Sequence, residues 1–423
     1  MDTEILRCVD ASAVADLDRQ PIDGAILDEA RSIVQAVRNG GDESLRDFAI
    51  QYDGLTADDP LRLEEDELEA AFDTLDVDIQ TVLMSTADRI EAFCQAQLDC
   101  LDDLEITVPG GRGGHTITAL DRAGCYAPGG GYPLPSSVLM TAVPATVAGV
   151  ESIIVASPDP DEMVLAAAHV AGVDEVLTAG GAQAMAALGF GTNTIQPCDI
   201  VVGPGGPWVT AGKKVITGFV RTDFMAGPTE LGILADESAD PALVAADLIA
   251  QAEHAPEALA VLVTPDESLI ERTDEELIAQ LSDLPTAEVA REAFETGFAV
   301  LVDDLEEGVA VSDDLAPEHL QLVGSRARTL VDQVNRYGTL FIGQETPESL
   351  GDYGVGPNHV LPTGGAARFT GGLSVFDFIR IPTFLEMTDS SYPAELKRDI
   401  PTLARMEGLE GHARSAERRF EDD

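Results

Sequence analysis

The chain has 423 residues, more than one ordinary hydrophobic core contains, so its length predicts two or more domains. It contains 25 Lys and Arg and 76 Asp and Glu, which gives a formal net charge of −51. That charge argues against binding to nucleic acid or anionic membranes, because their phosphates would be repelled. The acidic residues are scattered, and such a surface repels itself unless salt screens it, as at molar salt where the Debye length is ~3 Å. The sequence therefore predicts a protein adapted to a salt-rich cytoplasm.

Cysteine use and the apolar stretches also favour the cytoplasm. The chain has five cysteines, an odd number, and no CxxC motif, which fits a reducing compartment. The first residues lack the pattern of a signal peptide. The most apolar long stretch, 136–157, contains Pro144 and Glu151, so a buried helix followed by a strand explains it better than a membrane span.

In chain order, residues 24–98 come first and are predicted to form amphipathic helices. The segment "AILDEARSIVQAVRNGG" has apolar residues at helical spacing and ends in a glycine stop. From about residue 119, short β-branched runs alternate with helices, as in "SIIVASP" (152–158), "EVLTAGG" (175–181) and "DIVVGPGG" (199–206). This alternation predicts a parallel sheet covered on both faces.

A second series of strands and helices follows. It includes "ELGILADE" (230–237), "ALAVLVTP" (258–265) and "HLQLVG" (319–324). Two sheet domains in tandem suggest a cleft between them. The Gly- and Pro-rich stretch 343–372 predicts a long loop, and such a loop is usually functional. A strand and helices are expected beyond it.

The pattern predicts an α/β protein with four parts. We expect an N-terminal helical segment (1–118) that packs partly on the second sheet domain, a first sheet domain (119–229), a second sheet domain (230–372) and a tail domain (373–423). Residues 396–423 hold six Lys and Arg and seven Asp and Glu. This near balance differs from the rest of the chain and favours contact with another protein surface.

Four of the six histidines have polar neighbours that could carry chemistry. In "LIAQAEHAPE", Gln251 and His254 are three residues apart and share a helix face, so they could be a satisfied polar pair or half of a metal site. Glu318 and His319, in "LAPEHLQLVG", could be a water-activating carboxylate and a base, or an exposed loop pair. His169 is interpreted as a packed helix residue and His115 as a loop residue.

The remaining two histidines lie in the long loop and near the C-terminus. Asp352 and His359 occur in "GDYGVGPNH", where glycines allow tight turns, although Asp352 could simply form an Asx turn. His412, taken alone, would be a surface histidine. Nitrogen and oxygen donors of this kind suit zinc, but the HExxH and paired CxxC signatures are absent from the sequence.

Glycine-rich turns are a second candidate for ligand binding. They occur in "YAPGGGYPLPSS" (126–137), "TAGGAQA" (178–184) and "VGPGGPW" (202–208). Such turns admit a ligand to the backbone, and a helix N-terminus favours phosphate. The ordinary dinucleotide fingerprint G-x-G-x-x-G is not met, so each turn alone is more simply a tight connection.

Taken together, the motifs resemble the L-histidinol dehydrogenase family in order and spacing, from about residue 20 to the end. The resemblance is carried by "AGPTELGILAD" (226–236), "DLIAQAEHAP" (247–256), "APEHL" (316–320), "GDYGVGPNHVLPTGGAARF" (351–369) and "EGLEGH" (407–412). It implies the last step of histidine biosynthesis, in which NAD oxidises L-histidinol through histidinal to histidine. It also implies a homodimer with two incomplete Rossmann-like domains and one zinc ion in each active site.

The resemblance also implies roles for particular residues. Zinc would be bound by Gln251, His254 and Asp352 of one chain and by His412 of the other, and these ligands also surround the substrate. His319 would be the general base and Glu318 would activate water. Further contacts would come from Thr229, His359 and Glu407 for substrate, and from Tyr126, Gln183 and Gly206 for NAD. Gly206 departs from the family, which has Asn in its "GPGN" motif.

Two other functions remain open on the residues alone. A metal-dependent hydrolase could use the same site without NAD, with Glu318 driving a water molecule. A protein that only stores metal or binds a metabolite could also carry these ligands. Formation of NADH from histidinol would distinguish the dehydrogenase from both.

Overall fold

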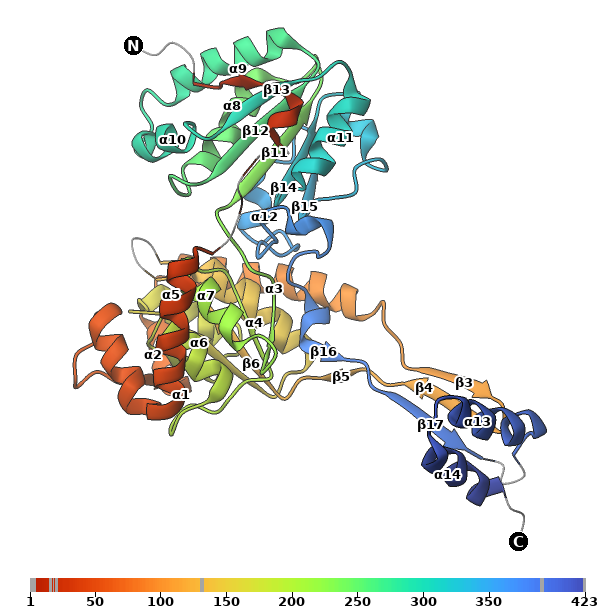
Figure 1. Ribbon diagram of the computed structural model, residues 1–423. Helices are drawn as coiled ribbons and strands as arrows, with labels where there is room; N and C mark the ends of the chain where they lie inside the picture. The colour runs from red at the N-terminus through yellow and green to blue at the C-terminus, as the bar shows by residue number, and fades with distance from the viewer. Residues whose placement is uncertain are drawn as a thin grey trace. The chain divides into compact units, whose positions relative to one another are not determined.

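The computed structural model describes residues 5–14, 17, 19, 22–129, 133–388 and 392–420. The chain divides into two compact units, one of Met1–Gln95 with Leu120–Phe378 and one of Ala96–Ala119 with Ile379–Asp423. The larger unit contains two sheets with helices around them (Figure 1). The α/β fold class expected from the sequence is confirmed.

The first sheet has the strand order β10-β9-β6-β7-β8-β2. All neighbours are parallel except β2 and β8, which are antiparallel. Strand order reverses between β6 and β9, which creates a crevice at the carboxyl ends of the strands. Its strands are β2 (Arg62–Glu64), β6 (Arg122–Tyr126), β7 (Ser152–Ala156), β8 (Glu175–Leu177), β9 (Ile200–Val202) and β10 (Arg221–Thr222).

Helices from two parts of the sequence accompany this sheet. Four follow its strands: α4 (Pro135–Ala148), α5 (Glu162–Val170), α6 (Gly181–Phe190) and α7 (Pro207–Ile216). The N-terminal segment supplies α1 (Gly24–Tyr52), α2 (Glu65–Thr74) and α3 (Val77–Leu98). Helix α1 packs against α6 and α7, and α2 packs against α5. Much of the N-terminal segment therefore belongs to the first sheet.

The glycine stop expected in the first helix is a kink rather than an end. Asp23 caps α1 by accepting from the backbone N–H groups of Ala25 and Ile26. Gly41 has φ 60° and ψ −138°, and a Cβ there would come 2.5 Å from Asn193 Oδ1. Only glycine meets both conditions easily, and the chain resumes helical structure to Tyr52.

The second sheet has the order β1-β13-β12-β11-β14-β15 and is parallel throughout. All six residues of β11 and of β12 are buried, which explains their continuous apolar sequence. Strand order reverses between β11 and β14. The strands are β1 (Cys8–Val9), β11 (Glu230–Ala235), β12 (Leu259–Thr264), β13 (Phe298–Leu301), β14 (His319–Val323) and β15 (Thr339–Ile342).

Helices cover both faces of the second sheet. The helices are α8 (Pro241–Ala252), α9 (Glu267–Gln280), α10 (Ala287–Ala293), α11 (Leu305–Leu315) and α12 (Ser349–Asp352). The 3-10 turns of the larger unit are η1 (Ala11–Val14), η2 (Ala327–Leu330), η3 (Ala366–Arg368) and η4 (Val375–Phe378). Two separate apolar clusters, one on each face of the sheet, form its core.

The smaller unit joins the tail to residues 96–119, which the sequence pattern assigned to the N-terminal segment. Strands β3 (Leu104–Val108), β4 (Gly111–His115) and β17 (Thr383–Met387) form an antiparallel sheet. His115 thus ends a strand and is not a loop residue. Glycines occur in β4 because neighbouring backbone is close: a Cβ at Gly114 would lie 1.8 Å from Leu104 O.

The rest of this unit consists of a strand pair and two helices. Strand β5 (Thr118–Ala119) pairs with β16 (Ile379–Arg380), and α13 (Ala394–Met406) packs against α14 (Glu410–Phe420).

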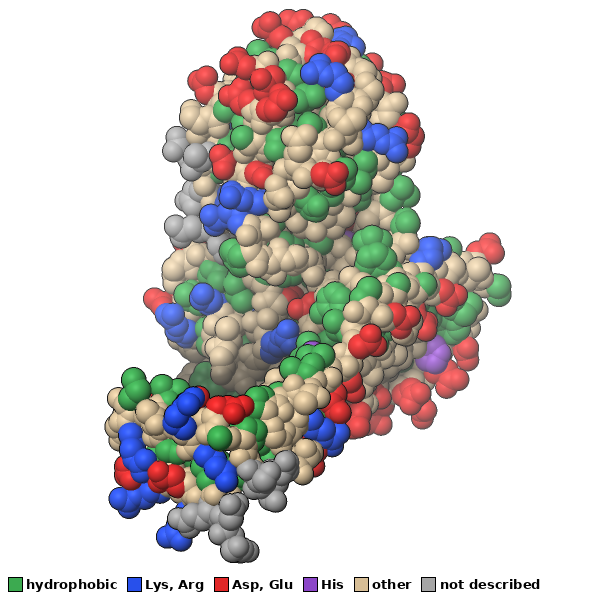
Figure 2. All heavy atoms as spheres, turned by 90° about the vertical axis from the view of Figure 1, so that its right-hand side faces the viewer, with side chains coloured by type: hydrophobic (Ala, Val, Ile, Leu, Met, Phe, Trp, Pro, Cys, Tyr) green, Lys and Arg blue, Asp and Glu red, His purple; other side chains and the backbone are tan. Residues whose placement is uncertain are grey.

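Surface and helix properties agree with the composition. Acidic side chains are spread over the face of the molecule drawn in Figure 2, in keeping with the net charge of −51. All five cysteines are free. Within the described part of the chain, no helix is long and apolar enough to cross a membrane.

Candidate functional site

A cavity of about 390 Å³ brings together residues that follow strands of the first sheet and residues that precede strands of the second. Four predicted substrate residues, Thr229, His254, Glu318 and His359, line it, as does Gly206. The other lining residues are Pro128, Pro204, Gly205, Phe224, Ala226, Gly227, Ala255, Val360, Leu361 and Thr363.

Glu318 directly precedes β14 and is 7% exposed. Its Oε2 accepts hydrogen bonds from Thr229 Oγ1 at 2.6 Å and from the Glu230 N–H at 3.0 Å. Burial raises the pKa of Glu318 to about 8, although both hydrogen bonds lower it. A carboxyl group with this pKa can exchange a proton near neutral pH.

His319 begins β14 and is 4% exposed. Burial lowers the pKa of its imidazole to about 4, so the ring is neutral at neutral pH and can accept a proton. Its Nδ1 lies 4.0 Å from Glu318 Oε2 and 3.5 Å from Glu348 Oε1. The Glu318–His319 pair is therefore buried, and it is not an exposed loop pair.

Gln251 and His254 lie at the end of α8, and Asp352 lies next to His254. The helix ends at Ala252, so Gln251 lies in its last turn and His254 lies just beyond it. His254 Nδ1 contacts Ala250 O at 2.9 Å, and His254 Nε2 lies 3.6 Å from Asp352 Oδ2. The fully buried Gln251 amide has no partner for either polar atom among the residues that the structure describes.

These three side chains fit a divalent cation. When Nδ1–H of His254 is donated to a backbone carbonyl, Nε2 is left as a lone-pair donor, which is the usual arrangement of a metal-binding histidine. The unpartnered amide oxygen of Gln251 and the Asp352 carboxylate add oxygen donors. Asp352 ends α12 and forms no Asx turn in the described structure.

Glu348 is a site residue that the sequence motifs did not bring out. It lies four residues before Asp352, and one of its carboxyl oxygens lies within 4.8 Å of a ligand atom of His254 and of Asp352. Burial and the nearby Asp352, Glu318 and Asp247 carboxyl groups raise its pKa well above the usual value. The spacing Glu-x-x-x-Asp places both carboxyl groups on one side of a helical turn, and this spacing could have identified Glu348 from the sequence.

The remaining predicted substrate residues fall in different places. His359 Nδ1 contacts Asp352 O at 2.9 Å, and burial lowers the pKa of His359. Glu407 and His412 belong to the smaller unit, where Glu407 caps the end of α13 and His412 lies in the first turn of α14. Both are exposed.

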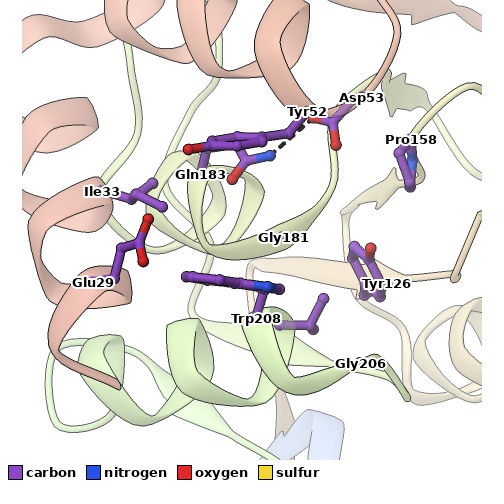
Figure 3. A pocket seen from close by; sticks show the side chains of 11 residues that line it. Glu29, Ile33, Tyr52, Asp53, Tyr126, Pro158, Gly181, Gln183, Gly206 and Trp208 are labelled. Atoms are coloured by element: carbon purple, nitrogen blue, oxygen red, sulfur yellow. Dashed lines mark hydrogen bonds between the residues drawn. The ribbon is translucent and has the colours of Figure 1, made fainter. Parts of the chain in front are cut away.

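A second cavity, of about 410 Å³, contains the residues predicted to bind NAD (Figure 3). Tyr126 ends β6, Gln183 lies in the first turn of α6, and Gly206 caps α7. Gly206 lines both cavities, so they adjoin at this residue. The other lining residues are Glu29, Ile33, Tyr52, Asp53, Pro158, Gly181, Trp208 and Val209.

Several features of this cavity do not follow from the sequence motifs. Gln183 Nε2 donates to Asp53 Oδ2 at 2.9 Å, and Asp53 also accepts from the Gly180 N–H. The rings of Tyr52 and Trp208 lie on opposite sides of the cavity, as Figure 3 shows. Trp208, the only tryptophan of the chain, lies two residues after Gly206 of the glycine turn. Its closeness to that turn could have identified it in the sequence as a cavity residue.

One cavity is bordered by glycine turns, and the cavity that adjoins it is lined by Glu318, next to the proton-accepting His319. These are the parts of a nucleotide-dependent oxidoreductase. Comparison with known proteins gives the family. The model of the histidinol dehydrogenase family matches residues 18–420. The histidinol dehydrogenase of Thermus thermophilus is 45% identical, over 94% of this chain and 95% of its own. That of Haloarcula marismortui is 42% identical, over 96% of each chain.

A solved structure agrees with the sequences. The crystal structure of histidinol dehydrogenase from Elizabethkingia anophelis matches with a TM-score of 0.91 at 31% identity, covering 98% of each chain. The chain belongs to the histidinol dehydrogenase family and is an oxidoreductase of histidine biosynthesis, in a family that uses NAD.

Proposed function

We propose that the protein oxidises L-histidinol to L-histidinal and then to L-histidine, with NAD as hydride acceptor in both steps. The observation that supports this most directly is a cavity lined by the buried Glu318, which precedes the neutral buried His319, and this cavity adjoins the glycine-turn cavity at Gly206. In the first step, the hydroxyl proton of histidinol moves to His319, and a hydride leaves the carbinol carbon for NAD, giving histidinal and NADH.

The second step consumes one water molecule. Glu318 accepts a proton from water as the water oxygen adds to the aldehyde carbon, and the resulting hydrate anion transfers a hydride to a second NAD. The product carboxylic acid then loses its proton. Since Glu318 is held by Thr229 and the Glu230 N–H, its carboxyl group is oriented before water arrives.

Gln251, His254 and Asp352, completed by His412 of the partner subunit, would hold one zinc ion in each site. The unpartnered Gln251 amide, in the described part of the fold, and the His254 Nδ1 contact with Ala250 O support this assignment. Zinc would supply a fixed positive charge that anchors the amine and imidazole of the substrate. Thr229, His359 and Glu407 would contact the substrate as well.

Tyr126, Gln183 and Gly206 would contact NAD in the glycine-turn cavity. Two helices of ten residues, α6 and α7, begin at this cavity, and their N-terminal N–H groups favour a pyrophosphate. Asp53 holds the Gln183 amide nitrogen, which leaves the amide oxygen available to a ligand.

An assay of NAD reduction with L-histidinol in concentrated salt tests the function. We expect two NADH per histidinol consumed and L-histidine as product. A stoichiometry of one, with histidinal accumulating, would contradict the second step. Absence of NADH with fully folded protein would contradict the function itself.

Shared active sites in a homodimer can be tested by complementation. Refolding a His254→Ala chain with a His412→Ala chain makes about half of the dimers mixed, with one intact site each, so roughly one quarter of wild-type activity should return. Either variant alone should be inactive. If heterodimers form without activity, His412 does not act across the interface.

The protein would work in a salt-rich cytoplasm. Its net charge of −51 and its similarity to a Haloarcula relative support this. We expect the thermal unfolding midpoint, followed by circular dichroism, to rise with salt because screening relieves self-repulsion. A midpoint that does not change with salt would contradict it.

A further inference from the structure

The two oxidation steps described above leave Glu348 without an assigned role, although it is among the least accessible carboxyl groups of the fold. It is 2% exposed, and neither carboxyl oxygen has a hydrogen-bond partner among the described residues. A buried carboxyl group without partners is costly, so its retention calls for an explanation. The nearest ring nitrogen, His319 Nδ1, is also buried and unpartnered within the same described residues.

These two unpartnered groups face each other. Glu348 Oε1 lies 3.5 Å from His319 Nδ1, a few tenths of an ångström beyond the usual N–H···O range. We propose that Glu348 is a positioning residue, which accepts the Nδ1 proton of His319 and leaves Nε2 to take the substrate proton. The proposal rests on the proposed function for its kinetic consequences.

The local structure holds Glu348 in this place. Its carbonyl accepts from the Gly351 N–H at 2.7 Å, which closes the turn that begins α12. A Cβ at Gly351 would lie 2.8 Å from the Phe341 ring, so glycine lets this turn pack closely on β15. The Phe341 ring in turn lies 5.9 Å from the His319 ring. The turn, the strand and the histidine are thus packed as one group.

Glu318 is less suited to the same task. Its Oε2 lies farther from Nδ1, at 4.0 Å, and that oxygen already accepts from Thr229 and the Glu230 N–H. The other alternative is that Glu348 binds the metal, because one of its carboxyl oxygens also lies near His254 and Asp352. Zinc content and a double-variant cycle distinguish these two roles.

The chemistry balances with one proton on the pair before the reaction. The step requires Glu348 as a carboxylate, and a cation held by His254 and Asp352 would offset the burial and the neighbouring carboxyl groups that raise the pKa of Glu348. With Glu348 ionised, neutral His319 carries its proton on Nδ1 and donates it to the carboxylate, so that Nε2 presents a lone pair. When Nε2 accepts the alcohol proton, the positive charge that develops on the ring lies beside a carboxylate. This is the role of the acidic residue in a Ser-His-Asp triad.

The test compares Glu348→Ala and Glu348→Gln with a matched control, Glu345→Gln, an exposed carboxyl group three residues earlier. We expect Glu348→Ala to lower kcat by about 100-fold, with KM for histidinol changed less than about twofold and bound zinc per chain unchanged. Glu348→Gln should recover about tenfold of this loss, because its amide oxygen can still accept from Nδ1. The control should match wild type.

A double-variant cycle shows whether Glu348 acts through His319. If it does, Glu348→Gln should cost nothing further in a His319→Asn background, whereas an independent role would make the losses multiply. Multiplying losses would overturn the proposal, and so would loss of zinc from both Glu348 variants. If Glu348→Ala does not fold, the double-variant cycle can still be measured with the near-isosteric Glu348→Gln.

A measurement without turnover separates this proposal from the proposed function. With six histidines in the chain, ¹⁵N-histidine labelling can be assigned by comparison with His319→Asn. We expect His319 to be protonated on Nδ1 in the wild type and to lose this preference in Glu348→Ala. An Nε2-protonated His319 in the wild type would overturn the positioning role even if the enzyme oxidises histidinol.

Discussion

The two sheets of the larger unit resemble each other in strand number, yet they present their functional groups at opposite ends of their strands. In the first sheet, Tyr126 ends β6, and Gln183 and Gly206 follow β8 and β9. In the second, Glu318 precedes β14 and His319 begins it. The first sheet follows the rule that ligands bind at the carboxyl ends of parallel strands, and the second does not.

The carboxyl end of the second sheet differs from that of the first because an acidic side chain of the protein lies there. At its switch point, between β11 and β14, Asp236 accepts from the N–H groups of Ser238 at 2.8 Å and Ala327 at 2.8 Å. A Cβ at Gly324 would come 2.3 Å from Asp236 Oδ1, so the carboxylate lies directly on a glycine turn. The Asp236 carboxylate thus takes up backbone N–H donors at this switch point. Similar sheets therefore do not imply similar sites.

The largest effect is expected from removing a metal ligand beside the second sheet. His254→Ala should lose bound zinc and lower kcat/KM by at least about 10³-fold, because the substrate loses its anchor. Metal analysis and NADH formation measure both effects. Glu253→Gln, an exposed neighbour, is the control. A His254→Ala protein that keeps its zinc and its rate would show that the catalytic cavity needs no metal there.

The next effect separates the two oxidations. Glu318→Gln should slow histidinal oxidation by about 100-fold and histidinol oxidation by less than about tenfold, because an amide cannot take the proton of water. Rates with the two substrates measure the difference. Equal losses would mean that Glu318 serves both steps.

Asp236→Asn tests the contrast between the two switch points. It should lower the free energy of unfolding by about 2 kcal/mol, because an amide nitrogen then faces buried N–H donors. Denaturant unfolding measures this, with the exposed Glu237→Gln as control. KM for NAD should not change. A large rise in that KM would place a cofactor contact on the second sheet and break the comparison.

The pH dependence should also differ between the two steps. Burial raises the pKa of Glu318 to about 8, so the group is protonated and cannot accept a proton at lower pH. Histidinal oxidation should therefore rise about tenfold per pH unit below 8 and level off above it. Because burial lowers the pKa of His319 to about 4, histidinol oxidation should stay nearly flat from pH 6 to 8. In Glu318→Gln the rise should disappear.

The smallest effect concerns the first cavity. Gly206 has φ −64°, and a Cβ there would meet nothing within 4 Å, so an asparagine fits without strain. Gly206→Asn should lower KM for NAD about threefold, the effect of one hydrogen bond of roughly 0.6 kcal/mol. Gly206→Ala, which adds no polar group, should leave KM unchanged. An increase in KM with Asn would show that the glycine itself is required.

The sequence by itself determined the features that depend on local pattern. Alternating β-branched and helical runs predicted the parallel sheets, and the glycine after α1's first half predicted a break that the structure places at Gly41. Motif order and spacing alone pointed to His254, Glu318 and Asp352. Hydrophobic period, turn chemistry and motif spacing are local properties, so one chain suffices to show them.

Only the tertiary structure decided which remote segments meet. It placed β2 beside β8, joined residues 96–119 to the tail, and brought Tyr52 across from Trp208. It also showed that Glu348 is buried against His319 rather than solvated. Burial and facing partners come from long-range packing, and a carboxyl group's pKa depends on both, so the chemistry of Glu348 could not be inferred from its neighbours in sequence.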